Sequence, residues 1–284
     1  MAAESIPLPR LVIFDLDGVV YRGDQAVPGA AGLVAALRAA GCLVRFATNN
    51  SMSTRQAYVE RLGMHGIPST TDEIVTSTSA TIDHLHAHVP EVRTVLAVGA
   101  SGMLDELQAA GFAVTPSDRA APPGWSGGLL PQRHDAVLVG LDPAFDYRRL
   151  GIAAAAIRAG ARFIATNADL RYPTPDGLLP GAGSIVAALQ AASGMVPQVI
   201  GKPQPAMFRA IVESAGVAAA EALVVGDNPD ADIVAARRLG AASVLMLTGV
   251  AEARGLDALD GERRPDRVAA DPAALAGMFG LTLS

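Results

Sequence analysis

The chain has 284 residues, of which 50% are hydrophobic and 18% charged, with a formal net charge of -6 and one cysteine. This size and apolar content predict a large buried core with a second, smaller unit, and they exclude a disordered chain. The negative charge argues against a nucleic-acid partner, because binding to a phosphate backbone needs a basic surface. Cys42 alone cannot form an internal disulfide, and no stretch is typical of a secretory leader or a membrane span. We therefore expect a cytoplasmic protein without a membrane partner.

The first predicted element is the apolar run 11–14, followed at once by Asp15, Leu16, Asp17 and Gly18. A continuous apolar run is typical of a buried parallel strand, and ligands in open α/β sheets bind at the carboxyl ends of the strands. Asp15 and Asp17 carry like charges two residues apart, which a cation or a shared proton would relieve. The run therefore predicts a first strand that ends in a chemically active loop.

Strand and helix patterns alternate through the rest of the first and last parts of the chain. Strands are predicted at 43–47, 73–77, 198–200, 222–225 and 243–247. Helices are predicted at 28–41, 53–62, 80–88, 184–192, 204–216 and 233–239, before a tail, 251–284, that is polar and then weakly helical. This alternation predicts a doubly wound parallel sheet of the α/β class, similar to a Rossmann fold.

The middle of the chain contains a self-contained α/β set. Its predicted strands are 92–98, 112–115, 136–141 and 162–165, and its predicted helices are 103–110 and 147–159. Residues 120–132 are typical of a loop, and the proline and glycine residues of 174–183 are typical of a linker. We therefore predict a core made of residues 1–81 and 180–284, with an inserted α/β cap domain over residues 82–179.

Three further polar clusters follow strands or begin helices. They are Thr48 with Asn49 and Asn50, Lys202 between a glycine and a proline, and Asp227 with Asp232. Because the strand ends of a parallel sheet lie along one edge, four carboxylates, one lysine and several hydroxyl and amide donors can converge there. Carboxylate oxygens suit Mg²⁺, and no Cys/His cluster has zinc spacing. A carboxylate nucleophile, Mg²⁺ and a lysine together indicate phosphoryl transfer from a phosphate monoester through an aspartyl-phosphate.

These motifs, in this order, resemble those of the haloacid dehalogenase superfamily over nearly the whole chain. Residues 15–19 resemble its first motif, 48–50 its second, Lys202 its third, and 226–227 with Asp232 its fourth. The long insertion, together with 166–173 and 180–184, is similar to the branch, subfamily IIA, that has the second type of α/β cap. That branch includes p-nitrophenyl, phosphoglycolate, glycerol-phosphate and pyridoxal-phosphate phosphatases. The fourth motif departs from the branch at Asn228 and Ala231, where arginine or serine, and threonine, are usual.

The resemblance implies a role for each motif residue. It implies that Asp15 is the nucleophile and a Mg²⁺ ligand, that Asp17 is the general acid and base and ligates Mg²⁺ through its carbonyl, and that Asp227 ligates Mg²⁺ directly. It also implies that Lys202 neutralises the transferring group, that Asp232 orients Lys202 or a metal-bound water, and that Thr48, Asn49 and Asn50 hold the phosphate. Arg171 and Tyr172 lie where related phosphatases place substrate contacts, although a structural role is an equal alternative. The implied substrate is a small phosphorylated metabolite, and the implied assembly is a homodimer through the cap.

Other functions remain open at this point. A phosphotransferase or phosphomutase would use the same intermediate, whereas a non-catalytic binding module on the same fold would be expected to have lost Asp15, Asp17 or Lys202. The turn 98–102 is an incomplete dinucleotide fingerprint, so an oxidoreductase is disfavoured.

Several polar or aromatic residues outside the motifs have simpler interpretations. We interpret His84, His86 and His88 as a partly exposed helix face, since only the first and last share a face. Asp230 is interpreted as a solvated or capping residue. Trp125 fits either cap packing or a substrate platform, and the sequence does not choose between them.

Overall fold

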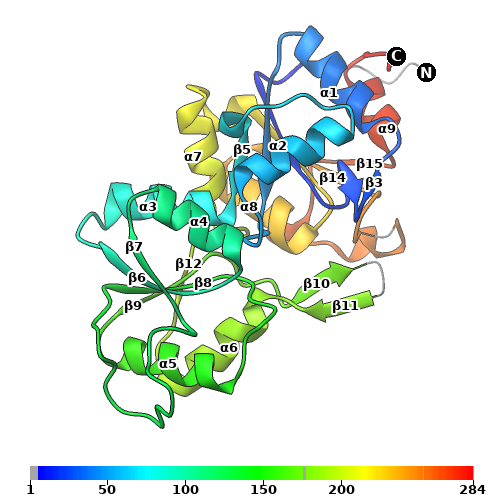
Figure 1. Ribbon diagram of the computed structural model, residues 1–284. Coiled ribbons are helices and arrows are strands. Elements are labelled where there is room, and N and C mark those ends of the chain that lie inside the picture. The colour runs from blue at the N-terminus through cyan, green and yellow to red at the C-terminus, as the bar shows by residue number, and fades with distance from the viewer. Residues whose placement is uncertain (1–5, 175–176, 252, 284) are drawn as a thin grey trace. The chain divides into compact units, whose positions relative to one another are not determined.

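The computed structural model describes residues 6–174, 177–251 and 253–283. The described residues form two compact units, the first from 6–48, 55–75, 202–251 and 253–283 and the second from 49–54, 76–174 and 177–201 (Figure 1). The chain passes between the units after Thr48, Thr54, Val75 and Gly201. The first five residues, on which the expectation of no secretory leader partly depends, lie outside the described part.

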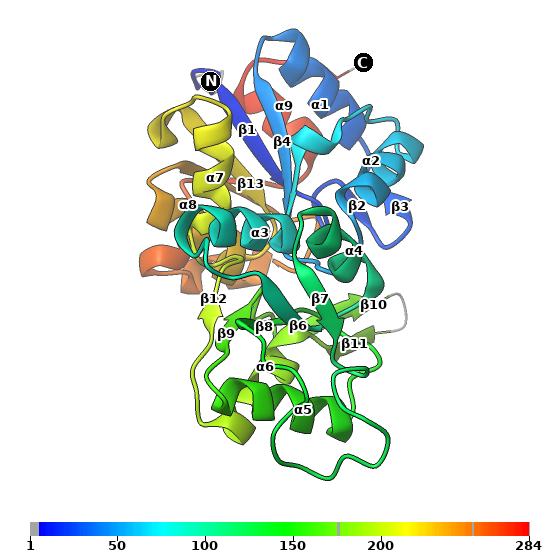
Figure 2. The same cartoon turned by 60° about the vertical axis from the view of Figure 1, so that its left-hand side comes forward.

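The first unit is built on a six-stranded sheet with the order β15-β14-β13-β1-β4-β5. Its strands are β1 (Leu11–Asp15), β4 (Leu43–Thr48), β5 (Ile74–Thr76), β13 (Ala222–Gly226), β14 (Ala242–Met246) and β15 (Arg267–Ala269), and a short hairpin joins β2 (Tyr21–Arg22) to β3 (Gln25–Ala26). Its helices are α1 (Ala30–Ala39), α2 (Arg55–Met64), α7 (Ala206–Ser214), α8 (Val234–Leu239) and α9 (Pro272–Met278), with a π-helical turn, Pro229–Ile233, before α8. Figure 2 shows α7 and α8 on one face of this sheet and α1, α2 and α9 on the other.

The central strand β1 positions the candidate site. Each of its five residues is buried, as expected for an apolar strand covered by helices on both faces. It runs parallel to β13 on one side and β4 on the other, with Phe14 beside Val225 and Asp15 beside Ala47. Asp15, Thr48 and Asp227 are therefore at the carboxyl ends of three neighbouring strands.

The second unit is built on a five-stranded parallel sheet with the order β12-β9-β8-β6-β7. Its strands are β6 (Thr94–Val98), β7 (Ala113–Pro116), β8 (Ala136–Val139), β9 (Arg162–Ala165) and β12 (Gln198–Val199), and β10 (Arg171–Thr174) pairs with β11 (Gly177–Pro180) in an antiparallel hairpin. Its helices are α3 (Ser77–His88), α4 (Ser101–Ala109), α5 (Tyr147–Arg158) and α6 (Ala182–Ser193). Helices α3 and α4 lie on one face of the sheet and α5 and α6 on the other (Figure 1).

The predicted fold class is confirmed, and each strand predicted from the sequence is present. The segment 174–183 differs from the prediction, because the described part of this supposed linker contains β11 and the start of α6. All four residues of β11 are exposed, so the strand has no alternation of apolar and polar residues by which to detect it. Residues 175–176 of the same segment lie outside the described part.

The boundaries of the two compact units also differ from those of the predicted domains. Residues 49–54, 76–81 and 180–201, which are predicted to belong to the core, pack within the second unit. The physical reason is clear in α6, where Ile185, Val186 and Leu189 are buried in the same apolar core as α5. Among the residues that the structure describes, no helix has the length and apolar character needed to cross a membrane.

Candidate active site

A lysine bridges two carboxylates at the end of β1. Lys202 Nζ donates hydrogen bonds to Asp15 Oδ1 at 2.5 Å and to Asp232 Oδ1 at 2.7 Å. The side chains of Lys202 and Asp232 are 3% and 1% exposed, and that of Asp15 is 11% exposed. Because an unpaired charge at this depth would be strongly unfavourable, the three groups depend on one another.

Asp227 adds a third carboxylate to this cluster. Asp15, Asp227 and Asp232 each present one oxygen, and the three oxygens lie within 4.8 Å of one another. Three carboxylates facing one ammonium leave an excess of two negative charges. Hard oxygen ligands with this charge suit a divalent cation such as Mg²⁺, which binds through a few carboxylates and keeps several waters. The donor set therefore fits the metal that the sequence predicts.

The pKa values of these groups reflect the same excess of negative charge. Burial raises the pKa of Asp15 well above its ordinary value, and Asp232 and Asp227 raise it further, while Lys202 acts in the opposite direction. Burial, together with Asp232, also raises the pKa of Asp227 to about 7, although the N–H of Val250 lowers it. Burial lowers the pKa of Lys202, but Asp15 and Asp232 outweigh burial and hold that pKa above its ordinary value. The lysine is therefore a cation at neutral pH, and the carboxyls retain protons more readily than usual.

Glycines make room for the carboxylate of Asp227. A Cβ on Gly18, where φ is +83°, would lie 2.3 Å from Asp227 Oδ2, and a Cβ on Gly249 would lie 1.8 Å from the same atom. The loop that contains Gly249 follows β14, where Val250 N donates to Asp227 Oδ2 at 2.7 Å and Thr248 Oγ1 donates to the Gly18 carbonyl at 2.6 Å. This loop is not among the site residues predicted from the sequence. The signal was a threonine and a glycine directly after a buried strand, the same pattern that marked the other strand ends.

Asp17 lies outside the three-carboxylate cluster. The residue as a whole is exposed, but neighbouring protein atoms shield its carboxyl group from water, and this desolvation raises its pKa. The positive charges of Arg61 and Lys202 lower the pKa but do not cancel the effect of desolvation. The next residue fixes the turn, because Gly18 N donates to the Tyr21 carbonyl at 2.7 Å. A raised pKa makes a carboxyl group better suited to donating and accepting protons in catalysis.

The boundary between the two units lies within the predicted phosphate-binding motif, between Thr48 and Asn49. Thr48 is buried and ends β4 in the first unit, whereas Asn49 belongs to the second. Asn49 Nδ2 donates to Asp169 Oδ1 and Oδ2 at 3.1 and 3.0 Å, and its carbonyl accepts from Ser77 Oγ and Asn167 Nδ2, both at 2.7 Å. The side chain of Asn49 is therefore oriented by Asp169.

Two family models match separate parts of the chain. The model for haloacid dehalogenase-like hydrolases matches residues 12–113, and a HAD-hydrolase-like model matches residues 199–275. The chain is 33% identical to the 5'-nucleotidase YutF of Bacillus subtilis over 84% of this chain and 87% of that protein. The chain belongs to the haloacid dehalogenase-like hydrolase family.

Solved structures of this hydrolase family have the same fold. The 4-nitrophenylphosphatase of Thermotoga maritima superposes with a TM-score of 0.84 at 30% identity, covering 94% of this chain and 96% of that one. The glycerol phosphate phosphatase of Mycobacterium tuberculosis, solved in complex with magnesium, superposes with a TM-score of 0.82 at 34% identity, covering 94% of this chain and 76% of that one. These similarities confirm the family resemblance drawn from the sequence, and p-nitrophenyl phosphatases are members of the predicted branch.

The remaining predicted residues of this hydrolase lie elsewhere. Arg171 and Tyr172 are on β10, paired with Pro180 and Leu179, and their contact with substrate stays a prediction. Asn50 Oδ1 accepts a hydrogen bond from Met52 N at 2.9 Å.

The simpler interpretations of the other polar residues are consistent with the structure. His84, His86 and His88 lie on α3, where His84 is half-buried and the other two are exposed, as expected for a partly exposed helix face. Asp230 is exposed and pairs with Arg263 at 3.1 Å, as expected for a solvated residue.

Proposed function

We propose that this protein is a Mg²⁺-dependent phosphatase that hydrolyses a small phosphate monoester through an aspartyl-phosphate on Asp15. Relatives named 5'-nucleotidase, 4-nitrophenylphosphatase and glycerol phosphate phosphatase support a hydrolase that acts on phosphoric monoesters. The observation that carries the mechanism is the bridging of Asp15 and Asp232 by Lys202, with Asp227 in the same cluster.

In the first step an oxygen of Asp15 attacks phosphorus, and the bond from phosphorus to the ester oxygen breaks. Asp17 donates its proton to that leaving oxygen, which a raised pKa favours. The ammonium of Lys202 neutralises charge on the transferring phosphoryl group, and Asp232 holds that ammonium in place. Thr48 and the amide of Asn49 hold the phosphate oxygens, as in the resemblance.

In the second step water attacks the phosphorus of the aspartyl-phosphate. Asp17, now a carboxylate, removes a proton from the water, and the bond from phosphorus to Asp15 breaks to release phosphate. Asp15, Asp227 and the carbonyl of Asp17 would hold Mg²⁺, which when bound supplies positive charge to the phosphate oxygens.

The proposed partner is a small phosphorylated metabolite rather than a nucleic acid, in keeping with the net charge of -6. Arg171 and Tyr172 are its proposed contacts in the second unit. Pairing of two copies through the second unit is also a proposal, and light scattering on the purified chain tests it.

The test compares Asp15→Asn with Asp230→Asn, which removes a nearby but exposed carboxylate. With 4-nitrophenyl phosphate and Mg²⁺, Asp15→Asn should lose at least about a thousandfold in kcat, while Asp230→Asn should keep the wild-type rate. Acid quenching should trap phosphate on the wild-type chain and on Asp230→Asn but not on Asp15→Asn. Residual turnover above a tenth of wild type in Asp15→Asn, or full activity after chelation of divalent ions, would contradict the mechanism. Transfer to added glycerol that exceeds release to water would instead indicate a phosphotransferase.

A further inference from the structure

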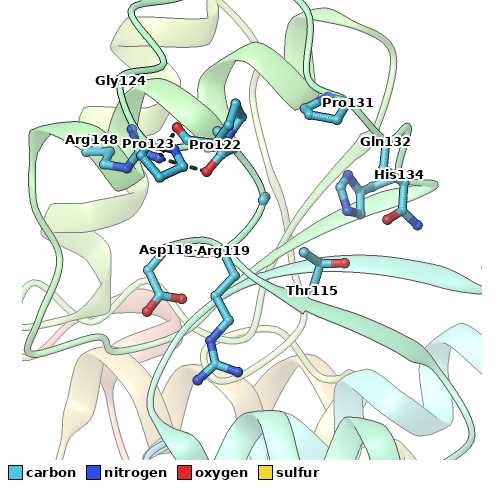
Figure 3. A pocket seen from close by; sticks show the side chains of 12 residues that line it. Thr115, Asp118, Arg119, Pro122, Pro123, Gly124, Pro131, Gln132, His134 and Arg148 are labelled. Atoms are coloured by element: carbon cyan, nitrogen blue, oxygen red, sulfur yellow. Dashed lines mark hydrogen bonds between the residues drawn. The ribbon is translucent and has the colours of Figure 1, made fainter.

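The second unit contains a hollow that shares no residue with the carboxylate cluster. Its volume is about 810 Å³, and its walls come from the loop 117–135 between β7 and β8, with Thr115 from β7 and Arg148 from α5 (Figure 3). Small-molecule sites commonly have volumes of roughly 300 to 1,000 Å³. The hollow is therefore large enough for a metabolite.

Part of the wall is apolar. It includes adjacent alanines and prolines at 120–123 and a further proline at 131. Arg148 holds the beginning of this loop, because its guanidinium donates to the carbonyls of Ala121 and Pro122 at 2.8 and 2.9 Å (Figure 3). A ligand with a short carbon skeleton could pack against these side chains.

His134 supplies polar atoms that lack partners. The residue is 7% exposed, and neither ring nitrogen has a hydrogen-bond partner within the described part of the chain. In Figure 3 its ring extends toward the hollow from the side opposite Arg148. Burial lowers the pKa of His134, so the neutral ring offers one N–H donor and one acceptor lone pair. Buried polar atoms nearly always have a partner, and a bound ligand would provide one here.

The carboxylates near His134 form hydrogen bonds and ion pairs with other groups. Asp135 accepts from the backbone N–H groups of Arg93 and Thr94 at 2.9 and 2.8 Å and from Thr94 Oγ1 at 2.8 Å. Asp118, at the edge of the hollow, pairs with Arg149 at 3.6 Å. The acids near the hollow are therefore already engaged.

Positive charge remains in excess around the hollow. Arg119 and Arg148 both line it, and no carboxylate of the described residues forms an ion pair with either guanidinium. Arg149, which is not among the residues that line the hollow, forms ion pairs with Asp118 and Asp142. In a chain of net charge -6, a locally cationic hollow favours an anion.

We propose that this hollow binds a small hydroxylated organic anion, whose acidic group faces the arginines and whose hydroxyl group pairs with the imidazole of His134. The acidic group could be a carboxylate or a phosphate, since both are attracted by guanidinium groups. The site is additional to the proposed phosphatase site and does not depend on it.

The test observes the imidazole nitrogens of the five histidines by NMR in the intact Asp15→Asn chain without Mg²⁺, so that no probe is hydrolysed. The probes are malate, glycerol 3-phosphate and, as a neutral polyol, erythritol. The nitrogens of His134 should shift saturably with at least one anion, with a Kd of about 1 mM or tighter, while those of the exposed His86 stay fixed. A response to malate alone identifies a carboxylate site, and a response to glycerol 3-phosphate alone identifies a phosphate site.

Two variants keep the test decisive. His134→Phe removes one set of imidazole signals and thereby assigns those of His134. Arg119→Gln lies at an exposed position that should tolerate the change, and it should weaken binding about tenfold. The proposal is overturned if no anion changes the chemical shifts of the His134 nitrogens, or if erythritol changes them equally. It is also overturned if the Asp15→Asn chain that carries Arg119→Gln binds the anion as tightly as Asp15→Asn alone. Because the readout needs no turnover, its failure leaves the proposed phosphatase function untouched.

Discussion

Replacement of Asp227 by asparagine should stabilise the metal-free protein at alkaline pH. The substitution keeps an oxygen that can accept from Val250 N but removes one of three clustered negative charges. The pKa of Asp227 is raised from 3.8 to about 7, a shift of about 3 pK units, which corresponds to at most about 4 kcal/mol. Between these two values the folded state binds more protons than the unfolded state. The free energy of unfolding therefore falls as pH rises through this window.

Urea unfolding in the presence of a chelator measures this effect. From pH 5 to pH 8, wild type should lose about 2 to 3 kcal/mol of stability relative to Asp227→Asn, and Asp230→Asn should follow wild type. Adding Mg²⁺ at pH 8 to about a hundred times its Kd should stabilise wild type by about 2.7 kcal/mol and Asp227→Asn far less. A stability difference between wild type and Asp227→Asn that does not change with pH would refute the reasoning.

Three further substitutions test other parts of the site. Lys202→Met removes the ammonium that lies 2.5 Å from Asp15, so kcat should fall at least about a thousandfold and the free energy of unfolding in urea should fall by about 3 kcal/mol or more. A stable, active variant would contradict the pairing. Asp169→Ala frees the side chain of Asn49, so KM for 4-nitrophenyl phosphate should rise about tenfold, whereas an unchanged KM would remove Asp169 from any positioning role. Gly249→Ala adds a Cβ that would lie 1.8 Å from a carboxylate oxygen of Asp227, so the affinity for Mg²⁺, measured by calorimetry, should fall at least about tenfold. An affinity equal to that of wild type would show that the loop can move.

The sequence predicts the sheet architecture because apolar runs such as 11–14 are typical of buried parallel strands, and because motif residues follow them directly. It also predicts which strand ends converge, since a parallel sheet places them along one edge. The family resemblance leaves open whether Asp232 orients Lys202 or a metal-bound water. The two residues are 30 positions apart, and only the packed fold shows that the ammonium of Lys202 donates to Asp232.

Other features left no pattern in the sequence. Strand β11 is exposed along its whole length, so hydrophobic periodicity could not identify it. The assignment of α6 to the second unit depends on tertiary packing of Ile185 and Leu189 rather than on helix propensity. The hydrogen bonds from Ser77 and Asn167 to the carbonyl of Asn49 join residues that no local rule connects.

The places where the chain passes between the units have a consequence for engineering and for evolution. Residues 49–54 belong to the second unit although residues 55–75 return to the first. A chimera that exchanges only 76–201 would keep its own Asn49 but receive foreign residues in place of Ser77 and Asn167, so the hexapeptide 49–54 must travel with the insert. An exchange of the second unit between members of this lineage therefore preserves the hydrogen bonds to the carbonyl of Asn49 only if part of the second motif is exchanged with it.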